Sequence, residues 1–364
     1  MTSVLPSLTN MMSLGGGALT ALNKTNSMHP PDFLHKDAET KLNEHYIAAG
    51  AVCSLSTNSE QILDAARNTF QPAHFKTGEV DFRLRFWVDE TDRSRPPWPK
   101  PYVRGLDHLV FAGFDERSSM LADLRKCRVI GRFSSGMAGD AAYWRMVMFP
   151  MLMSILAGSI GLVELHASCV SRHDQGLILT GPSRSGKSTL AMALTKAGFK
   201  LHSDDRTFCS LKQERILAYG LPRPLKLRRD GASWFDGIRD QEPNAVQGDE
   251  RVFYCEPDQR FGERASSGCE PRALIFLDRQ QDSSFCLTRM RRSEVKACVE
   301  KDLLMETPEV IRRQERILNN LPALPCWNLR FGGAPQVIAE QIVSAFFDNS
   351  ESNHSQTGSV GRTI

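Results

Sequence analysis

A glycine-rich stretch in the middle of the chain carries the residue types best suited to chemistry. It reads GPSRSGKS over residues 181–188 and fits the pattern G-x-x-x-x-G-K-[ST] in full. In such a loop the backbone N–H groups turn inward around a phosphate, and glycine permits the close approach. Lys187 would then reach the β- and γ-phosphates, and the hydroxyl of Ser188 would hold Mg²⁺. The sequence therefore predicts a site for a nucleoside triphosphate, with ATP and Mg²⁺ as the expected cofactors.

The surroundings of this loop favour the same interpretation. An apolar run, QGLILTG, precedes it, and KSTLAMALTKAG follows it with the pattern of a helix that ends at Gly198. The alternative is a Gly/Ser turn before an ordinary helix, but a strand on one side and a helix on the other is the context that confirms the motif. The residues expected to bind the nucleotide are Gly181, Ser183, Arg184, Ser185, Gly186, Lys187, Ser188 and Thr189.

Two adjacent carboxylates form the second candidate feature. Asp204 and Asp205 end the apolar run FKLHS, 17 and 18 residues after Lys187. Strand ends on this side of a parallel sheet face the ligand crevice, so one aspartate can hold metal while the other accepts the proton of an incoming hydroxyl. A solvated Asp-Asp turn is the structural alternative. The pair gives the loop a candidate base and a candidate metal ligand.

The elements that must position these residues follow from apolar patterning. LVELHASCV and QGLILTG are apolar strands separated by the turn-like SRHD, ALIFLD (residues 273–278) is another buried strand, and PQVIAEQIVSAFF (residues 335–347) is an amphipathic helix. Strands and helices that alternate in this way predict an α/β fold for the C-terminal half. We expect a P-loop domain over residues 141–348.

The N-terminal half has a different pattern. VDFRLRFWVD (residues 80–89) alternates apolar and polar side chains as a half-buried strand does, the turn-rich SRPPWPKP follows, and DHLVFAGF and CRVIGRF are further short strands. Residues 41–140 are therefore expected to form a smaller α+β domain without a catalytic motif. The polar segments 1–40 and 349–364 are expected to be disordered.

One uncharged stretch needs separate consideration. MVMFPMLMSILAGSIGLV covers residues 146–163 without a charge, which is long enough to span a membrane. Its proline, serines and glycines make it a poor span, and its glycines predict a helix that ends near Gly158 before a strand that begins at Leu162. A buried helix that leads into a buried strand is the expectation, and no membrane partner is predicted.

Composition excludes several classes of protein. The 364 residues carry 45 Lys and Arg against 42 Asp and Glu, without a basic run, so no nucleic-acid partner is expected. The nine cysteines are odd in number and form no CxxC pair, which argues against a disulfide framework or a zinc site and favours the cytoplasm. The chain lacks an NKxD motif after the loop and an LSGGQ-like helix, which GTPase switches and ABC ATPases carry.

Three features together resemble the HPr kinase/phosphorylase family, whose core is related to PEP carboxykinase. They are His166 in LHAS, 15 residues before Gly181, the loop GPSRSGKS, and the Asp-Asp pair behind KAGFKL. The resemblance implies that Asp204 is the base that activates an acceptor serine and that His166 orients or polarises Asp204. It also implies that Asp205 joins Ser188 at the metal, and that the protein forms a homo-oligomer.

The chain departs from the family after the aspartates. The family's glycine-rich signature, which carries a metal-binding glutamate, is replaced by AYGLPRPLKLRRDG over residues 218–231, which has no glutamate. This segment carries Arg223, Lys226, Arg228 and Arg229, and alternation in PRPLKLRR would place them on definable faces of a strand. We expect Arg223 to contact phosphate oxygens in the transition state. A solvated basic edge is the alternative.

The expected activity is transfer of the γ-phosphate of ATP to a hydroxyl, with a serine of a protein or peptide as the acceptor and the N-terminal domain as its recognition element. Two alternatives stay open. Asp278 ends the apolar ALIFLD as the acid of a Walker B strand would, which would suit a P-loop ATPase that couples hydrolysis to conformational change. A small-molecule kinase would use the same acids on a different hydroxyl.

Overall fold

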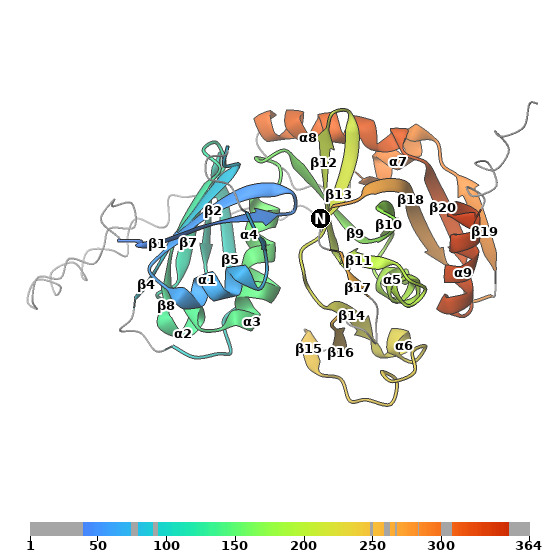
Figure 1. The fold of residues 1–364 in the computed structure, drawn as a ribbon, viewed down its shortest axis with the longest axis horizontal. Helices are drawn as coiled ribbons and strands as arrows, with labels where there is room; N and C mark the ends of the chain where they lie inside the picture. Colours follow the sequence, from blue (N-terminus) through green and yellow to red (C-terminus); the bar gives the residue numbers. More distant parts are fainter. Residues whose placement is uncertain are drawn as a thin grey trace, which may run out of the picture. The chain divides into compact units, whose positions relative to one another are not determined.

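The computed structural model describes residues 39–73, 79–89, 94–247, 250–257, 263–265, 268–282, 284–299 and 308–348 (Figure 1). Of the segments 1–40 and 349–364, which were expected to be disordered, residues 1–38 and 349–364 lie outside the described residues. Within the described residues the fold is mixed α/β and contains three sheets.

The first sheet occupies the N-terminal part of the chain and has the strand order β3-β1-β2-β4-β8-β7-β6-β5. Strands β2, β4 and β8 are parallel neighbours, and the remaining pairs are antiparallel. The three strands predicted from sequence in this region are confirmed as β4, β6 and β8. The strands are β1 (Leu42–Ala48), β2 (Ala51–Thr57), β3 (Gln71–Pro72), β4 (Phe82–Asp89), β5 (Tyr102–Leu106), β6 (Leu109–Gly113), β7 (Ser119–Asp123) and β8 (Arg128–Ser134).

One helix between β2 and β3 and several helical segments after β8 complete the first core. They are α1 (Glu60–Arg67), α2 (Ser135–Ala138), α3 (Ala141–Tyr143), a π-helical turn (Trp144–Met148) and α4 (Phe149–Leu156). Phe133 and Phe149 both pack on the Trp144 ring, with centroid distances of 4.9 and 5.2 Å. Burial of α4 in this aromatic core explains its lack of charge, because burying an unpaired charge is costly. It ends before Gly158, and no helix among the described residues is long and apolar enough to cross a membrane.

The second sheet carries the candidate site and has the order β13-β12-β9-β10-β18-β20-β19, with β11 paired to β9 and β17. Strands β10, β18 and β20 are parallel, whereas β9 is antiparallel to both β10 and β11. Strands β10 and β11 therefore run in the same direction. The strands are β9 (Leu162–Arg172), β10 (Gln175–Thr180), β11 (Lys200–Ser203), β12 (Arg206–Lys212), β13 (Arg215–Tyr219), β17 (Glu263–Arg264), β18 (Glu270–Arg279), β19 (Phe285–Arg289) and β20 (Cys326–Phe331).

Helices cover both faces of this sheet (Figure 1). On one face α5 (Lys187–Lys196) and α9 (Pro335–Phe346) pack over Leu177 and Leu179, and on the other α7 (Arg292–Val299) and α8 (Pro308–Asn320) pack over Ile178. Successive side chains of a strand point to opposite faces, so the unbroken apolar run of β10 follows from burial on both sides. The strands predicted at 162–170, 175–180 and 273–278 and the helices predicted at 187–198 and 335–347 are confirmed within a few residues.

A third, small sheet lies in the segment after β13. It has the order β14-β16-β15, formed by β14 (Leu225–Arg228), β15 (Ala245–Gln247) and β16 (Glu250–Cys255), and it is accompanied by α6 (Arg229–Ala232). In β14 the two leucines are buried in the core shared with α5, while Lys226 and Arg228 are half-buried on the other face. The strand expected over PRPLKLRR (residues 222–229) thus covers only Leu225–Arg228, and Arg223 lies before it.

Candidate active site

The glycine-rich loop connects the carboxyl end of β10 to the first residue of α5. Gly186 has a φ of 93°, and Gly181 has a φ of 149°, a region that side chains rarely adopt. A Cβ at Gly181 would lie 2.9 Å from the carbonyl oxygen of Leu277 on the neighbouring β18. Both positions therefore favour glycine because of their positive φ angles, and at Gly181 a side chain would also clash with β18.

The lysine of the loop is folded against the loop's own backbone. The Lys187 ammonium donates to the carbonyl oxygens of Gly181 at 2.7 Å and Pro182 at 3.1 Å, and the residue is only 8% exposed. The hydroxyl of Ser185 is buried and has no hydrogen-bond partner among the described residues. Buried polar groups are normally hydrogen-bonded, so an orphaned hydroxyl inside a phosphate-type loop fits a ligand that supplies oxygens there.

The two aspartates sit where the pairing along β9 is interrupted. Strand β11 pairs with the second half of β9 and β12 with its first half, and the Asp-Asp pair lies between them. Their main-chain oxygens are bonded by β9: Asp205 O accepts from Ala167 N at 3.2 Å, and Asp204 O accepts from the Ser168 hydroxyl. Irregularities of this kind re-aim side chains, and here both aspartates line a cavity.

Asp204 is a buried carboxyl group with unused bonding capacity. It is 7% exposed, its Oδ2 accepts from the backbone N–H of Lys226 at 2.8 Å, and its Oδ1 is buried without a hydrogen-bond partner within the described part of the chain. Burial raises the pKa of Asp204 to about 6, a rise that the nearby Ser188 hydroxyl and Lys226 N–H limit. A carboxyl group with this pKa is ionised at neutral pH and can still accept a proton.

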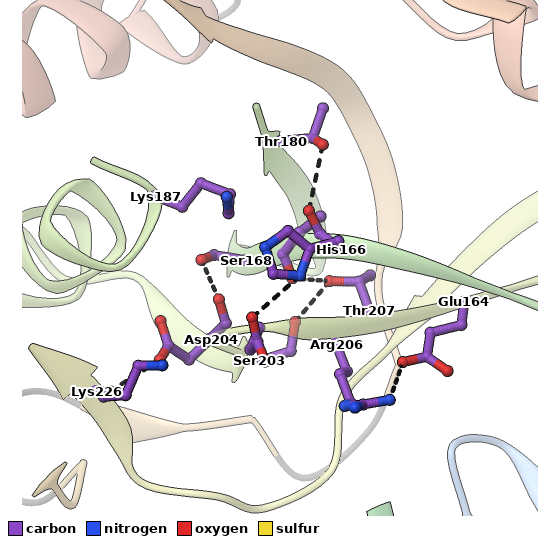
Figure 2. Close-up of polar contacts among 12 residues, drawn as sticks. Glu164, His166, Ser168, Thr180, Lys187, Ser203, Asp204, Arg206, Thr207 and Lys226 are labelled. Carbon is purple, nitrogen blue, oxygen red and sulfur yellow. Dashed lines mark hydrogen bonds and ion pairs between the residues drawn. The ribbon is translucent and has the colours of Figure 1, made fainter. Parts of the chain in front are cut away.

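The histidine contacts the other aspartate. His166 extends from β9, and its Nδ1 lies 3.2 Å from Oδ1 of Asp205, with the two side chains 49% and 40% exposed. The resemblance implied a contact with Asp204, so this expectation is corrected. The reason is the break in the β9 pairing, after which the two neighbouring carboxyl groups take different directions. In Figure 2, His166 extends from β9 and Lys187 from α5, while Asp204 lies at the end of β11 and Lys226 in β14.

A cavity of about 130 Å³ brings most of the predicted nucleotide residues together. Ser183, Arg184 and the segment from Gly186 to Thr189 line it, with His166 and both aspartates opposite; Gly181 and Ser185 do not line it. Five lining residues were not predicted as site residues, although four of them belong to the cationic segment 218–231. They are Lys226, Leu227, Arg228, Asp230 and Arg279.

A second, smaller cavity of about 30 Å³ shares the two aspartates and Lys226 with the first. Arg223 and Tyr254 line it. Burial lowers the pKa of Arg223, an effect opposed chiefly by the charge of Asp205, and Nε of Arg223 is buried without a hydrogen-bond partner among the residues described. The structure thus brings Arg223 to the aspartates, on the side away from the glycine-rich loop. Tyr254 gave no sequence signal, because it comes from β16, 50 residues after Asp204.

Asp278 does not join this group. It is exposed at the end of β18, its Oδ1 accepts from the Gln280 amide at 2.8 Å, and it lines neither cavity. Its neighbour Arg279 lines the first cavity instead. Arg279 ends β18, which lies beside the P-loop strand β10, so its position at the cavity follows from the strand order of the sheet.

A further cavity, of about 460 Å³, lies elsewhere. Its lining includes Ala48, Phe70, His202, Tyr219 and Gly268 and contains no residue of the glycine-rich loop and neither aspartate. Its volume is within the range of ligand pockets, but it lacks the acids and the loop from which the predicted chemistry follows.

Comparison with known proteins gives little further information. No family model matches the chain, and no curated protein matches it. One match is a solved structure of the HPr(Ser) kinase/phosphatase from Coxiella burnetii. The match covers 54% of this chain and 99% of the Coxiella chain, with 14% sequence identity and a TM-score of 0.27. A likeness at this level carries no argument about the fold or the activity.

Proposed function

We propose that this protein is an ATP-dependent kinase that transfers the γ-phosphate to a hydroxyl group, with a serine of a protein or peptide as the acceptor. The observation that carries the proposal is the position of Asp204. This buried carboxyl, with one oxygen lacking a partner among the described residues, lines two cavities at once. One cavity is bordered by the phosphate-type loop and the other by Arg223 and Tyr254, so a donor and an acceptor can meet at the aspartate.

In this proposal the chain's residues have distinct tasks. Lys187 and the glycine-rich backbone hold the β- and γ-phosphates, and Arg228 and Arg279 add positive charge to the same cavity. Asp204 takes the proton of the acceptor hydroxyl as the oxygen attacks, and Arg223 faces the transferred group from the acceptor side. His166 orients Asp205 through their contact.

The residues present also fit the metal that such a reaction requires. Ser188 and Asp205 both line the first cavity and offer oxygens, the donor type that Mg²⁺ prefers. Mg²⁺ usually binds through one or two protein groups, substrate phosphates and water, and when bound it neutralises charge on the transferred phosphate. Groups of three or more His, Cys, Asp or Glu residues in metal-binding proximity do not occur among the described residues.

The alternative as a conformational ATPase depends on Asp278. An acid of the Walker B type must reach the metal beside the phosphates. Asp278 is exposed and bonded to Gln280, and the lining of the first cavity does not include it. These observations favour the kinase over the ATPase.

Two matched substitutions test the proposal. ATP labelled at the γ-position is supplied with Mg²⁺ and host lysate, and labelled proteins and peptides are identified by mass spectrometry for the wild type, Asp204→Asn and Asp278→Asn. We expect wild-type label on a serine, its loss in Asp204→Asn and its retention in Asp278→Asn. ATP hydrolysis without a labelled acceptor, abolished by Asp278→Asn and kept by Asp204→Asn, would show that the ATPase alternative is correct.

A further inference from the structure

Two cysteine side chains from distant parts of the sequence face each other in the core under α7 and α8. Cys169 lies in β9 and Cys269 immediately precedes β18, and their sulfurs are 3.7 Å apart. Both are buried, with exposed fractions of 0% and 2%. The direct contact between the two sulfurs makes this pair a candidate for thiol chemistry.

The backbone on both sides of the pair is fixed by strand pairing. Cys169 pairs with Ile178 of β10, and Cys269 exchanges two backbone hydrogen bonds with Ala218, of 2.8 and 2.9 Å. The Sγ of Cys269 lies over Gly176, where an added Cβ would be 2.5 Å from it. A disulfide needs a sulfur separation of about 2.05 Å. For a disulfide to form, the two sulfurs must therefore approach each other by side-chain rotation and a shift of a strand.

The surroundings make the two thiols unequal. Hydrogen bonds from Cys169 and from His202 lower the pKa of the Cys269 thiol against the opposing effect of burial, whereas the contact with Cys269 and burial raise the pKa of Cys169. The thiolate is the reactive form of cysteine. Cys269 also follows the cavity-lining Gly268, so it is the thiol placed to react first, and Cys169 is the thiol placed to resolve the product.

A cavity lies close to one residue of this pair. His202 and Gly268, the residue before Cys269, line the cavity of about 460 Å³. The ring of Tyr219 packs against Gly268, so a small neutral oxidant in the cavity lies one residue from Cys269, behind this ring. Hydrogen peroxide is of this size.

The pair is also connected to the candidate active site. Cys169 follows His166 by three residues on β9, and it is opposite Ser203, the residue before Asp204, in the pairing with β11. A shift of β9 at Cys169 would therefore move the strand that carries His166 and bonds the main chain of both aspartates.

We propose that Cys169 and Cys269 form an oxidisable dithiol, and that closing it to a disulfide slows phosphotransfer at the adjacent site. The second half rests on the proposed kinase function, whereas disulfide formation does not.

The chemistry uses hydrogen peroxide as the oxidant. The Cys269 thiolate attacks one peroxide oxygen, an S–O bond forms, the O–O bond breaks, and the second oxygen leaves as hydroxide. The sulfur of Cys169 then attacks the resulting sulfenic acid, the S–S bond forms, the S–O bond breaks, and the proton of Cys169 leaves with that oxygen as water. Two thiols and one peroxide give one disulfide and two waters.

Mass spectrometry of the full-length protein tests the site directly. Protein treated with hydrogen peroxide is blocked with N-ethylmaleimide and digested with trypsin. Cleavage after arginine gives peptides 146–172 and 265–272, each with one cysteine of the pair. We expect these peptides to be linked in the oxidised wild type and released by dithiothreitol. The link should be absent in Cys169→Ala and in Cys269→Ala but kept in Cys209→Ala, which removes another buried thiol of the same core.

The exposed Cys286 reports the oxidant dose in the same sample. Full oxidation of Cys286 with no linked 146–172 and 265–272 peptides would overturn the site. Phosphotransfer is then measured before and after oxidation, and we expect a fall of about tenfold that dithiothreitol reverses and that Cys169→Ala does not show. An unchanged rate in the disulfide form would overturn the regulatory half. A linked form in a protein that transfers no phosphate under any condition would support the dithiol and count against the kinase.

Discussion

Asp204 and Asp205 are neighbours in the chain, yet their environments differ. Asp204 is buried beside Ser188 and bonded by Lys226, while Asp205 is partly exposed and contacts His166. Burial penalises the charged form of the Asp204 carboxyl group, whereas the Asp205 carboxyl group is partly exposed to solvent. The two side chains can therefore divide the work of proton acceptance and metal binding, which identical environments would not allow.

Lys187 gives the first residue-scale prediction. Lys187→Ala removes the cation expected on the β- and γ-phosphates but leaves the loop backbone in place, so ATP with Mg²⁺ should no longer raise the melting temperature. Lys196→Ala, at the exposed end of the same helix, is the matched control and should keep the wild-type shift. An undiminished shift in Lys187→Ala would contradict the nucleotide site.

The pH dependence of phosphotransfer tests Asp204 as the base. A base works in its ionised form, so turnover should rise with pH as Asp204 ionises around its pKa of about 6 and then reach a plateau. Asp204→Asn should lower turnover by about 10²–10⁴-fold and lose this rise, with little change in ATP affinity. His166→Ala should lower turnover less. If Asp205→Asn instead abolished the rise while Asp204→Asn kept it, the two aspartates would have the opposite roles.

Stability should change in the opposite direction from activity at the same residue. Because the folded state raises the pKa of Asp204 from 3.8 to about 6, this group stabilises the fold below its unfolded pKa, and that stabilisation is lost as the pH rises through 6. The loss corresponds to roughly 3 kcal/mol. Urea denaturation measures the free energy of unfolding of both proteins. The value for Asp204→Asn minus the value for the wild type should increase by about 2–3 kcal/mol from pH 4 to pH 8. An equal difference between the two proteins at both pH values would show that the carboxyl group is not buried as described.

At the scale of elements, the site depends on the close packing of Gly220, the residue after β13, against β11. A Cβ added at Gly220 would lie 1.7 Å from the carbonyl oxygen of His202, a backbone atom that cannot move without shifting β11. Strand β11 leads directly into Asp204. The glycine after Tyr219 is therefore required by packing, not by its own φ angle.

Gly220→Ala should accordingly destabilise the protein by about 3 kcal/mol or more, since overpacking against backbone has no inexpensive relief. Chemical denaturation measures the effect. Gly105→Ala is the control, because an added Cβ there meets no atom within 4 Å, and its cost should stay within about 0.5 kcal/mol. A Gly220→Ala variant as stable as Gly105→Ala would mean that the loop after β13 does not pack on β11.

At the scale of the whole molecule, the supply of metal-binding groups bears on the direction of the reaction. The cationic segment 218–231 includes β14 and brings Lys226 and Arg228 to the cavity. Glu250 of β16 is held by Arg184 at 2.8 Å and by Arg228 at 2.9 Å. Metal binding in the proposed kinase then relies on Ser188, Asp205 and the phosphates of the nucleotide.

The proposed enzyme should therefore be a kinase with little phosphorylase activity. Inorganic phosphate brings fewer oxygens to Mg²⁺ than a triphosphate does, so the reverse reaction suffers most. The test supplies the phosphorylated acceptor with millimolar phosphate and measures pyrophosphate. Production of pyrophosphate at a rate comparable to the forward reaction would show that a protein group other than Ser188 and Asp205 also binds Mg²⁺.

The sequence by itself determined the loop, its flanking elements and the α/β pattern, because apolar periodicity and the glycine spacing are local properties. Strands β4, β9, β10 and β18 and helices α5 and α9 were predictable for that reason. Strands β15 and β16 were not, since their pairing with β14 joins segments that are separate in the sequence and carry no strong periodicity.

Only the tertiary structure decided which groups meet at the site. The pairing of β9 with both β11 and β12 turned His166 toward Asp205, the fold around β14 brought Arg223 and Tyr254 to the aspartates, and the end of β18 left Asp278 outside. The same packing placed Cys169 against Cys269 across 100 residues. Such contacts are set by the strand order and by local breaks in strand pairing, and both are properties of the whole sheet. A sequence motif, in contrast, depends only on its own residues.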